Sequence, residues 1–365
     1  MINKAYSFDI LTNLFATGAN AKVAEIRPSA IRGELRWWFR VLGGFADDAR
    51  PVQEQEREMF GGVHGSVTRS KLMVRVVVNP QTQAQCKDAD AFGARQNTPL
   101  GYLLFPLRSE KNKDGVVTKD RSRGYFPPNN TAIGEAFSMD VLWNGSEDSF
   151  RKIEALFSIW GQIGSLGFRS RRCMGALAFH GMPPCTLAEA FRVFKSPNSI
   201  TLKMLDRPYD NANDCTDALS NWLKEWRSHG RTPNLNSGPG FKFAKVDHDV
   251  GLTRNGRGEV MRPPLGLPII QRYTGDHRPK NEWTSPDCER FASPILLRPF
   301  RKQDGSWVPL VLFIENRMWP KGRKARITYD KKARPPRFFD RPVSNDLLDA
   351  IRDDRMLRGF SPSDV

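Results

Sequence analysis

The sequence predicts an α+β fold whose sheets are antiparallel and of the ferredoxin-like type. Two observations predict this class. Runs rich in β-branched and aromatic residues alternate with amphipathic helical segments along the chain. Some of these runs follow one another at hairpin distance, which a purely parallel sheet does not allow. Hydrophobic residues make up 39% and charged residues 26%, as in an ordinary globular protein.

The chain has 365 residues, enough for a large core divided between two domains. A cluster of breakers, Gly181, Pro183, Pro184 and Pro197, favours a connection near the middle of the chain. We therefore expect an N-terminal domain over residues 1–190 and a C-terminal domain over residues 191–365.

Periodic apolar segments fill the N-terminal half. Alternation predicts strands at residues 4–16, 70–79, 101–107, 136–143 and 176–180. Helical spacing predicts one helix that opens at Pro28 and Ser29 and ends at Gly43-Gly44, and two more at residues 53–60 and 149–163. Residues 111–123 are charged, contain glycine and lack a period, so we expect a mobile loop there.

The C-terminal half is less regular. The pattern predicts helices at residues 214–229 and 345–356, and strands at 265–272, 293–300 and 309–314. Residues 230–264 are rich in glycine, proline, asparagine and arginine and predict no element. Residues 321–341 form a basic segment with interleaved aromatics; RNA contact and a merely solvated loop are equally compatible with it.

The charge balance indicates a polyanionic partner. Lysine and arginine number 56 against 40 acidic residues, which gives a formal net charge of +16. Nucleic acid fits this excess best, and an anionic membrane surface fits it second. No apolar run reaches the roughly 20 residues that a membrane span needs, and we expect no secretion signal. The five cysteines are scattered and form no C-x-x-C pair, so we expect a reducing, cytoplasmic setting without disulfides.

The first helical segment carries the strongest signal. Arg32, Arg36 and Arg40 recur every fourth residue and form a basic ridge beside an apolar stripe. Ser29 is positioned to cap the helix, whose first turn then offers unpaired N–H groups to phosphate, and Gly33 follows Arg32. We expect these residues to hold an RNA backbone. An amphipathic helix with solvated arginines is the alternative.

A second signal is the glycine-rich segment from Gly164 to Gly175. Gly164, Gly167 and Gly175 allow the backbone to approach a ligand closely. Three arginines, Arg169, Arg171 and Arg172, supply phosphate donors, and Phe168 is suited to stacking on a base. The segment has no Gly-Lys-Ser/Thr, so it is not a nucleotide-hydrolysing loop. A basic surface hairpin is the alternative.

Catalytic chemistry has little support in the sequence. The five histidines are dispersed, and neither Gly-x-Ser-x-Gly nor His-Glu-x-x-His occurs. His64 and His248 are expected in polar loops where a general base is able to act on RNA. Asp247 and Asp249 form a D-x-D that weakly suggests a divalent ion. We expect no catalytic residue, no cofactor and no metal.

These segments together resemble the RAMP superfamily of CRISPR effector proteins, and most closely a member of the Cmr (type III-B) complex. Four places carry the resemblance: residues 11–18 leading into Ile26-Arg27-Pro28-Ser29-Ala30-Ile31-Arg32-Gly33-Glu34-Leu35-Arg36-Trp37-Trp38-Phe39-Arg40, then Met59-Phe60-Gly61-Gly62 with the 72–78 strand, the glycine-rich segment, and residues 265–269 with 290–295. Asn13, Cys173 and Ala176 depart from the family pattern. Cysteine disfavours positive φ, so position 173 bears on the shape of the loop.

The resemblance implies an RRM-type ferredoxin-like core in two related halves. It also implies a non-catalytic subunit at one end of an RNA-guided filament, which contacts guide RNA, target RNA and other Cmr-complex subunits, while cleavage belongs to a different subunit. Two other functions stay open: a RAMP-fold endoribonuclease that uses His64 or His248, and a subunit whose basic surface docks acidic protein partners.

Overall fold

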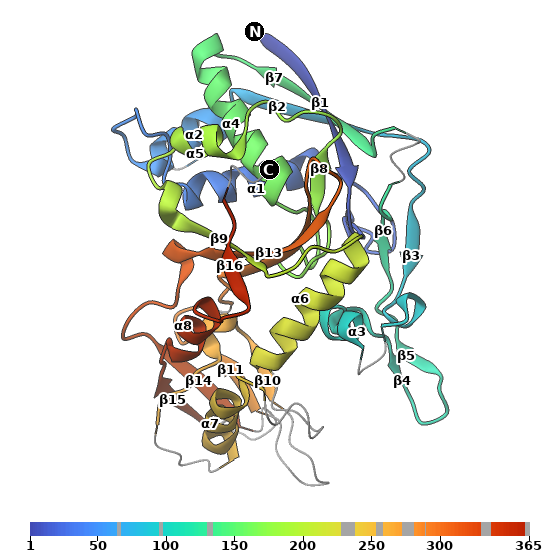
Figure 1. Cartoon of the computed structure of the whole chain (residues 1–365), viewed down its shortest axis with the longest axis vertical. Helices are drawn as coiled ribbons and strands as arrows, with labels where there is room; N and C mark the ends of the chain where they lie inside the picture. The colour runs from blue at the N-terminus through green and yellow to red at the C-terminus, as the bar shows by residue number, and fades with distance from the viewer. Residues whose placement is uncertain are drawn as a thin grey trace. The chain divides into compact units, whose positions relative to one another are not determined.

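The computed structural model describes residues 1–63, 67–94, 98–129, 134–227, 238–252, 258–271, 281–288, 290–329 and 337–361. These residues form helices and antiparallel sheets (Figure 1), which confirms the predicted α+β class. The helices are α1 (Pro28–Val41), α2 (Val52–Phe60), α3 (Pro99–Leu103), α4 (Glu147–Ile163), α5 (Leu187–Arg192), α6 (Ala212–Arg227), α7 (Phe241–Leu252) and α8 (Asp346–Arg352).

Strands in the first part of the chain are β1 (Ile2–Ile10), β2 (Leu72–Val78), β3 (Gln85–Lys87), β4 (Glu110–Lys111), β5 (Val117–Lys119), β6 (Arg123–Tyr125), β7 (Phe137–Trp143) and β8 (Leu177–Phe179). Those in the second part are β9 (Ile200–Leu205), β10 (Ile269–Gln271), β11 (Asn281–Thr284), β12 (Ile295–Arg301), β13 (Trp307–Ile314), β14 (Lys324–Tyr329), β15 (Arg337–Pro342) and β16 (Leu357–Gly359). Among the described helices, none is both long and apolar enough to cross a membrane.

The N-terminal sheet has the strand order β2-β7-β1-β8, and every neighbouring pair is antiparallel. Alternation buries one of its faces: β7 shows buried residues at every second position. Helix α4 packs on this face, where Phe8 of β1 contacts Trp160 with ring centroids 5.3 Å apart. Gly161 allows α4 to approach the sheet this closely, because a Cβ there would lie 2.4 Å from the Phe179 ring. A one-sided sheet covered by helices is the result.

Two further four-stranded sheets have the orders β12-β13-β9-β16 and β10-β11-β14-β15. By compactness the chain divides into two units, the first with residues 1–220, 296–311 and 359–365 and the second with residues 221–295 and 312–358. The second unit has its own core, in which Trp283, Trp319, Ile327 and Tyr329 are buried together. The assignment of residues 1–190 and 191–365 to two related domains stays a prediction.

The expectations for three whole segments are wrong. Residues 101–107 do not form a strand: Thr98 caps α3 by accepting from the Gly101 amide at 3.0 Å, and a short 3₁₀ turn follows. Residues 111–123 are not a featureless loop but contain the β4–β5 hairpin, whose turn is closed by the Asn112 side chain. Finally, α7 lies within the 230–264 stretch that predicted no element.

Candidate nucleic-acid interface

Helix α1 begins at Pro28, two residues earlier than a cap at Ser29 requires. Its N-cap is Arg27, in an extended conformation, and no side chain caps the helix. Pro28 occupies the first helical position, where its fixed φ fits and its missing N–H is not needed. Ser29 therefore lies inside the first turn instead of capping it, and the capping prediction is wrong.

The arginine ridge of α1 faces the C-terminal end of α2. Arg32 Nη2 donates to the Phe60 carbonyl at 2.6 Å, and Arg36 Nη2 donates to the same oxygen at 2.8 Å and to the Gly61 carbonyl. Arg40 Nε lies 2.8 Å from a carboxylate oxygen of Glu56. Cations that bind the last carbonyls of a helix stabilise it. The ridge thus has a structural role on α2, and its predicted contact with RNA stays a prediction.

Another side of α1 meets the glycine-rich loop, residues 164–175. The guanidinium carbon of Arg171 lies 4.8 Å from the centroid of the Trp37 ring. Glu34, half-buried one turn earlier on α1, has its pKa raised to about 7 by burial, an effect that the nearby Arg171 opposes. Gly33 is exposed and nothing lies within 4 Å of a Cβ built there. The structure therefore brings the two predicted signals side by side.

The glycines of the loop fix its shape. Gly167 and Gly175 have φ of 89° and 65°, and a Cβ on Gly175 would lie 1.9 Å from the Leu166 carbonyl oxygen. Gly164, which follows α4, is equally crowded, with the Trp160 carbonyl oxygen 2.4 Å from its virtual Cβ. Close packing of protein backbone, more than approach to a ligand, explains these glycines.

Cys173 adopts φ of +66° despite its side chain. Its side chain is completely buried, and burial raises the pKa of the thiol, so the residue is packed and unreactive. The Cys173 amide donates to the Leu297 carbonyl at 2.8 Å, the Phe168 amide to Phe15 at 2.8 Å and the Gly175 amide to Asn13 at 3.0 Å. These amides are committed to the protein, so phosphate contact falls to side chains.

Side chains of the loop form guanidinium–aromatic pairs with three different segments. Besides Arg171 over Trp37, the guanidinium of Arg123 lies 4.5 Å from the Phe168 centroid and that of Arg169 lies 5.9 Å from the Phe105 centroid. Arg169 Nε also donates to the Leu103 carbonyl at 2.7 Å. Arg172, by contrast, is only 7% exposed and donates to the backbone of Arg171, which gives it a structural role.

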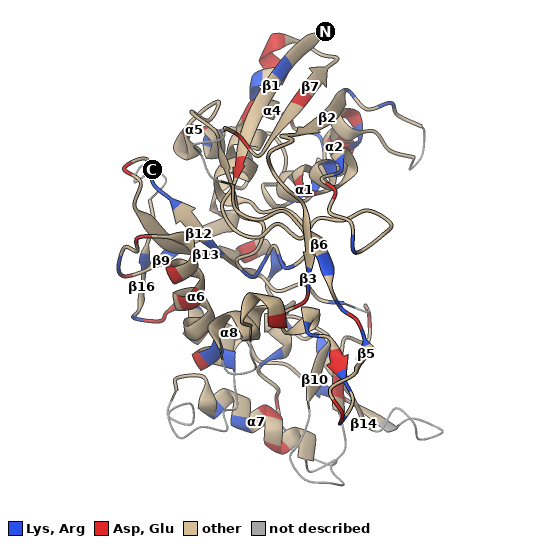
Figure 2. Cartoon of the chain, turned by 90° about the vertical axis from the view of Figure 1, so that its right-hand side faces the viewer, with Lys and Arg blue, Asp and Glu red and all other residues tan. Residues whose placement is uncertain are grey.

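Sequence reasoning missed Arg123 and Phe105. Arg123 is the first residue of β6, a strand labelled in Figure 2, and comes from the charged stretch that was expected to be a loop. Phe105 is 63% exposed beside α3. Arg123 has no local sequence signal for this role, because its partner Phe168 comes from a distant part of the chain. Only the folded chain brings these residues close to the glycine-rich loop.

The expected placement of the histidines is wrong where they are described. His248 lies on α7 and not in a loop, and its neighbour Asp247 accepts from the amides of Met261 and Arg262 at 2.7 and 2.9 Å. Asp249 pairs with Lys245 at 2.8 Å. His64 lies outside the described residues. Within the described part of the chain, no three His, Cys, Asp or Glu side chains group as metal ligands do.

The basic segment 321–341 lies in the second unit and is partly an antiparallel hairpin, β14–β15. Arg326 forms a bidentate pair with Asp340 at 2.7 and 3.0 Å and stacks on Phe338 at 4.3 Å. Residues 330–336, with several of its cations, lie outside the described residues. The described residues of this segment therefore form part of a β-sheet, and two of them form an ion pair.

Comparison with known proteins gives a family for the region that holds both α1 and the loop. The RAMP superfamily model matches residues 7–178. The region from residue 7 to residue 178 is thus similar to the RAMP superfamily. Two relatives from Pyrococcus furiosus are similar to it: CRISPR system Cmr subunit Cmr1-1 at 32% identity over 157 residues, and Cmr1-2 at 28% over 188 residues.

The matched regions differ in extent. They cover 42% of this chain and 40% of Cmr1-1, and 48% of this chain and 95% of Cmr1-2. A solved apo Cmr1 from Pyrococcus furiosus superposes with a TM-score of 0.51 at 18% identity, over 88% of this chain and 91% of that one. At that identity the likeness concerns the fold alone. It extends beyond the RAMP match into the C-terminal half.

Proposed function

We propose that this chain is a RAMP-superfamily protein and acts as an RNA-binding, non-cleaving subunit of a type III-B (Cmr) CRISPR effector complex. Its partners would be guide RNA, target RNA and other Cmr-complex subunits. The similarity to Cmr1 subunits and the net charge of +16 support this function. One observation carries it: guanidinium–aromatic pairs surround the glycine-rich loop beside α1.

Such pairs suit single-stranded RNA for a physical reason. A guanidinium stacked on a ring is held flat, so less side-chain entropy is lost when it binds a phosphate or a base. Exposed aromatic edges and faces add stacking, which is worth about 1–3 kcal/mol per base. Arg171 on Trp37 and Arg123 on Phe168 therefore form the centre of the proposed interface.

We also propose that residues 1–190 form an RRM-type ferredoxin-like domain and that residues 191–365 form a related one. The order β2-β7-β1-β8, with helices α1 and α2 after β1 and α4 after β7, supports the first assignment. It is the antiparallel arrangement expected of two βαβ units split around a central pair.

An RNA-cleaving activity is the second candidate function. The observation that favours it is His180, whose Nδ1 lies 2.9 Å from Oδ1 of the buried Asp9 and whose side chain is 36% exposed. A carboxylate that orients an imidazole is the arrangement of a general base. It is the second candidate because the same carboxylate also binds Arg301 and Asn129, as a structural linkage does.

The test measures binding of the purified chain to labelled single-stranded RNA across a salt series, with a cleavage gel on the same samples. Arg123→Gln and Arg171→Gln should each weaken binding and lower the salt slope by about 0.7 for each phosphate that the variant no longer neutralises. Arg75→Gln, which removes the same charge from an exposed position on β2, is the control. If the two variants behave like the control, the interface is wrong.

The gel decides between the two functions. Intact RNA throughout the binding range supports the non-cleaving subunit. Metal-independent cleavage that His180→Ala abolishes, with RNA binding unchanged, would replace it by the endoribonuclease. RNA that stays intact and unbound at physiological salt, with the chain still joining its complex, would point to protein docking instead.

A further inference from the structure

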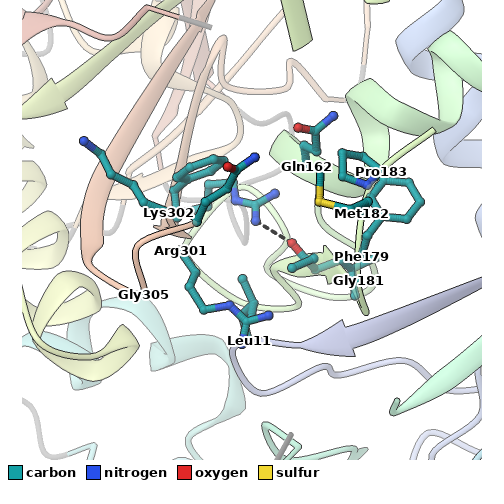
Figure 3. A pocket seen from close by; sticks show the side chains of 14 residues that line it. Leu11, Gln162, Phe179, Gly181, Met182, Pro183, Arg301, Lys302 and Gly305 are labelled. Carbon is teal, nitrogen blue, oxygen red and sulfur yellow. Dashed lines mark hydrogen bonds between the residues drawn. The ribbon is translucent and has the colours of Figure 1, made fainter. Parts of the chain in front are cut away.

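A pocket of about 570 Å³ lies in the first unit, and none of its lining residues belongs to the guanidinium–aromatic pairs. Figure 3 shows the side chains that line it, which come from β8 and the turn after it, from the end of α4 and from β12 with the turn that follows. Its volume is that of a site for a small organic ligand. The proposed RNA interface does not include it.

The pocket is electropositive. Arg298, Arg301 and Lys302 line it, and none of its fourteen lining residues is an aspartate or a glutamate. Arg298 is 1% exposed and donates to the carbonyls of Gly164, of Leu177 at 2.6 Å and of Pro299 at 3.1 Å. A buried cation held by neutral carbonyls lacks the countercharge that would offset its desolvation. Desolvation correspondingly lowers the pKa of Arg298 to about 9.

A buried carboxylate holds Arg301 in position. Its Nη2 lies 2.7 Å from Oδ2 of Asp9, which is itself 2% exposed and bound by His180 on its other oxygen. A guanidinium has five donors in a rigid fork, so one N–H group fixed on a buried carboxylate aims the fork as a whole. Lys302 follows Arg301 in the chain and also lines the pocket (Figure 3).

The remaining wall is apolar, with amide groups at two places. Phe179, Phe300 and Leu11 are buried side chains of this wall, and Met182, 79% exposed, lies at its edge. Gln162 and Gln303 supply the amides. A ligand complementary to such a site carries an anionic group at one end and a flat apolar body with polar edges at the other.

We propose that this pocket binds a nucleotide, with the phosphate at Arg301 and Lys302, near the buried charge of Arg298, and the base against the apolar wall. The nucleotide is either free or one residue of an RNA strand, since both present the same chemistry. The inference goes beyond the proposed function, because the pocket shares no residue with the interface around Arg123 and Arg171.

The test is calorimetric titration of the full chain with 5′-AMP, and separately with adenosine and with inorganic phosphate. We expect 5′-AMP to bind more tightly than either half alone. Lys302→Gln should weaken 5′-AMP binding roughly fivefold to tenfold. Gln303→Glu, which places a carboxylate in the lining at an exposed position, should weaken it at least as much. Lys113→Gln, an exposed lysine on the β4–β5 turn, is the matched control and should change nothing.

Each outcome decides something. Absence of 5′-AMP binding by the folded chain at millimolar ligand, or binding that neither lining variant weakens relative to Lys113→Gln, would overturn the nucleotide site. Competition between a single-stranded RNA and bound 5′-AMP would identify a strand nucleotide as the occupant, and RNA binding unaffected by saturating 5′-AMP would identify a free one. Loss of RNA binding in the Arg123 and Arg171 variants is a separate readout, so the two proposals fail independently.

Discussion

Replacement of Glu34 by glutamine should stabilise this protein, and more so as the pH rises. Glu34 is half-buried on α1, and desolvation raises its pKa from 4.5 to about 7, with Arg171 opposing the rise. Between these two pH values the folded chain holds a proton on Glu34 that the unfolded chain releases. The free energy of unfolding therefore falls as the pH rises through this window, and the full cost is present above pH 7.

The size of the effect follows from the two pKa values. One pKa unit corresponds to 1.36 kcal/mol, so the ionised Glu34 costs about 3 kcal/mol at pH 8.5 and about 1 kcal/mol at pH 5.5. Glu34→Gln keeps the shape and cannot ionise. Its advantage over the parent in unfolding free energy should therefore widen by about 2 kcal/mol between these pH values.

Urea denaturation of both chains at pH 5.5 and 8.5 measures this difference. Glu259→Gln, at an exposed position, is the control and should show no such widening. The parent should also bind RNA more weakly at pH 8.5 than at pH 6, because Glu34 then adds a negative charge beside Arg171, and Glu34→Gln should reduce that dependence. A stability advantage that is equal at both pH values would refute the desolvation argument.

Three more predictions concern the loop and its surroundings. Gly175→Ala should lower the unfolding free energy by about 2 kcal/mol or more in urea denaturation, whereas Gly305→Ala, also at positive φ but in open space, should lower it by about 1 kcal/mol. Arg298→Lys should cost about 2–3 kcal/mol in the same assay, since an ammonium cannot reach the three carbonyls that the guanidinium binds. With a thiol reagent, the exposed Cys86 should react first and Cys173 only after unfolding, as peptide mapping of the labelled chain would reveal.

The elements that the sequence predicts well are those with a strong local period. Helix α4 is expected at residues 149–163 and is Glu147–Ile163 in the structure. The prediction is close because the apolar stripe of this helix extends over four turns. Strand β7 is expected at 136–143 and is Phe137–Trp143, because alternation is strict where one face of a sheet is buried. Local pattern determines these elements without help from distant parts of the chain.

The partners of charged side chains could not be predicted in this way. The spacing of Arg32 and Arg36 shows a ridge, but their acceptor at Phe60 depends on how the chain returns after α2. Arg298 has no local signal at all: it lies in an apolar strand, and its carbonyl acceptors at Gly164 and Leu177 come from a distant, earlier part of the chain. Tertiary structure therefore decides which arginines bind to groups of the protein itself.

That division sets how the protein should respond to salt. Arg32 and Arg36 bind helix carbonyls and Arg298 is buried, so these cations release few counterions when RNA binds, although all count in the net charge of +16. The proposed interface instead places phosphate at arginines stacked on aromatic rings beside the loop, such as Arg171. The salt slope of RNA binding should consequently correspond to a few phosphate contacts around the glycine-rich loop. A slope that corresponds to the whole excess of basic residues would mean that RNA contacts much more of the chain than this interface.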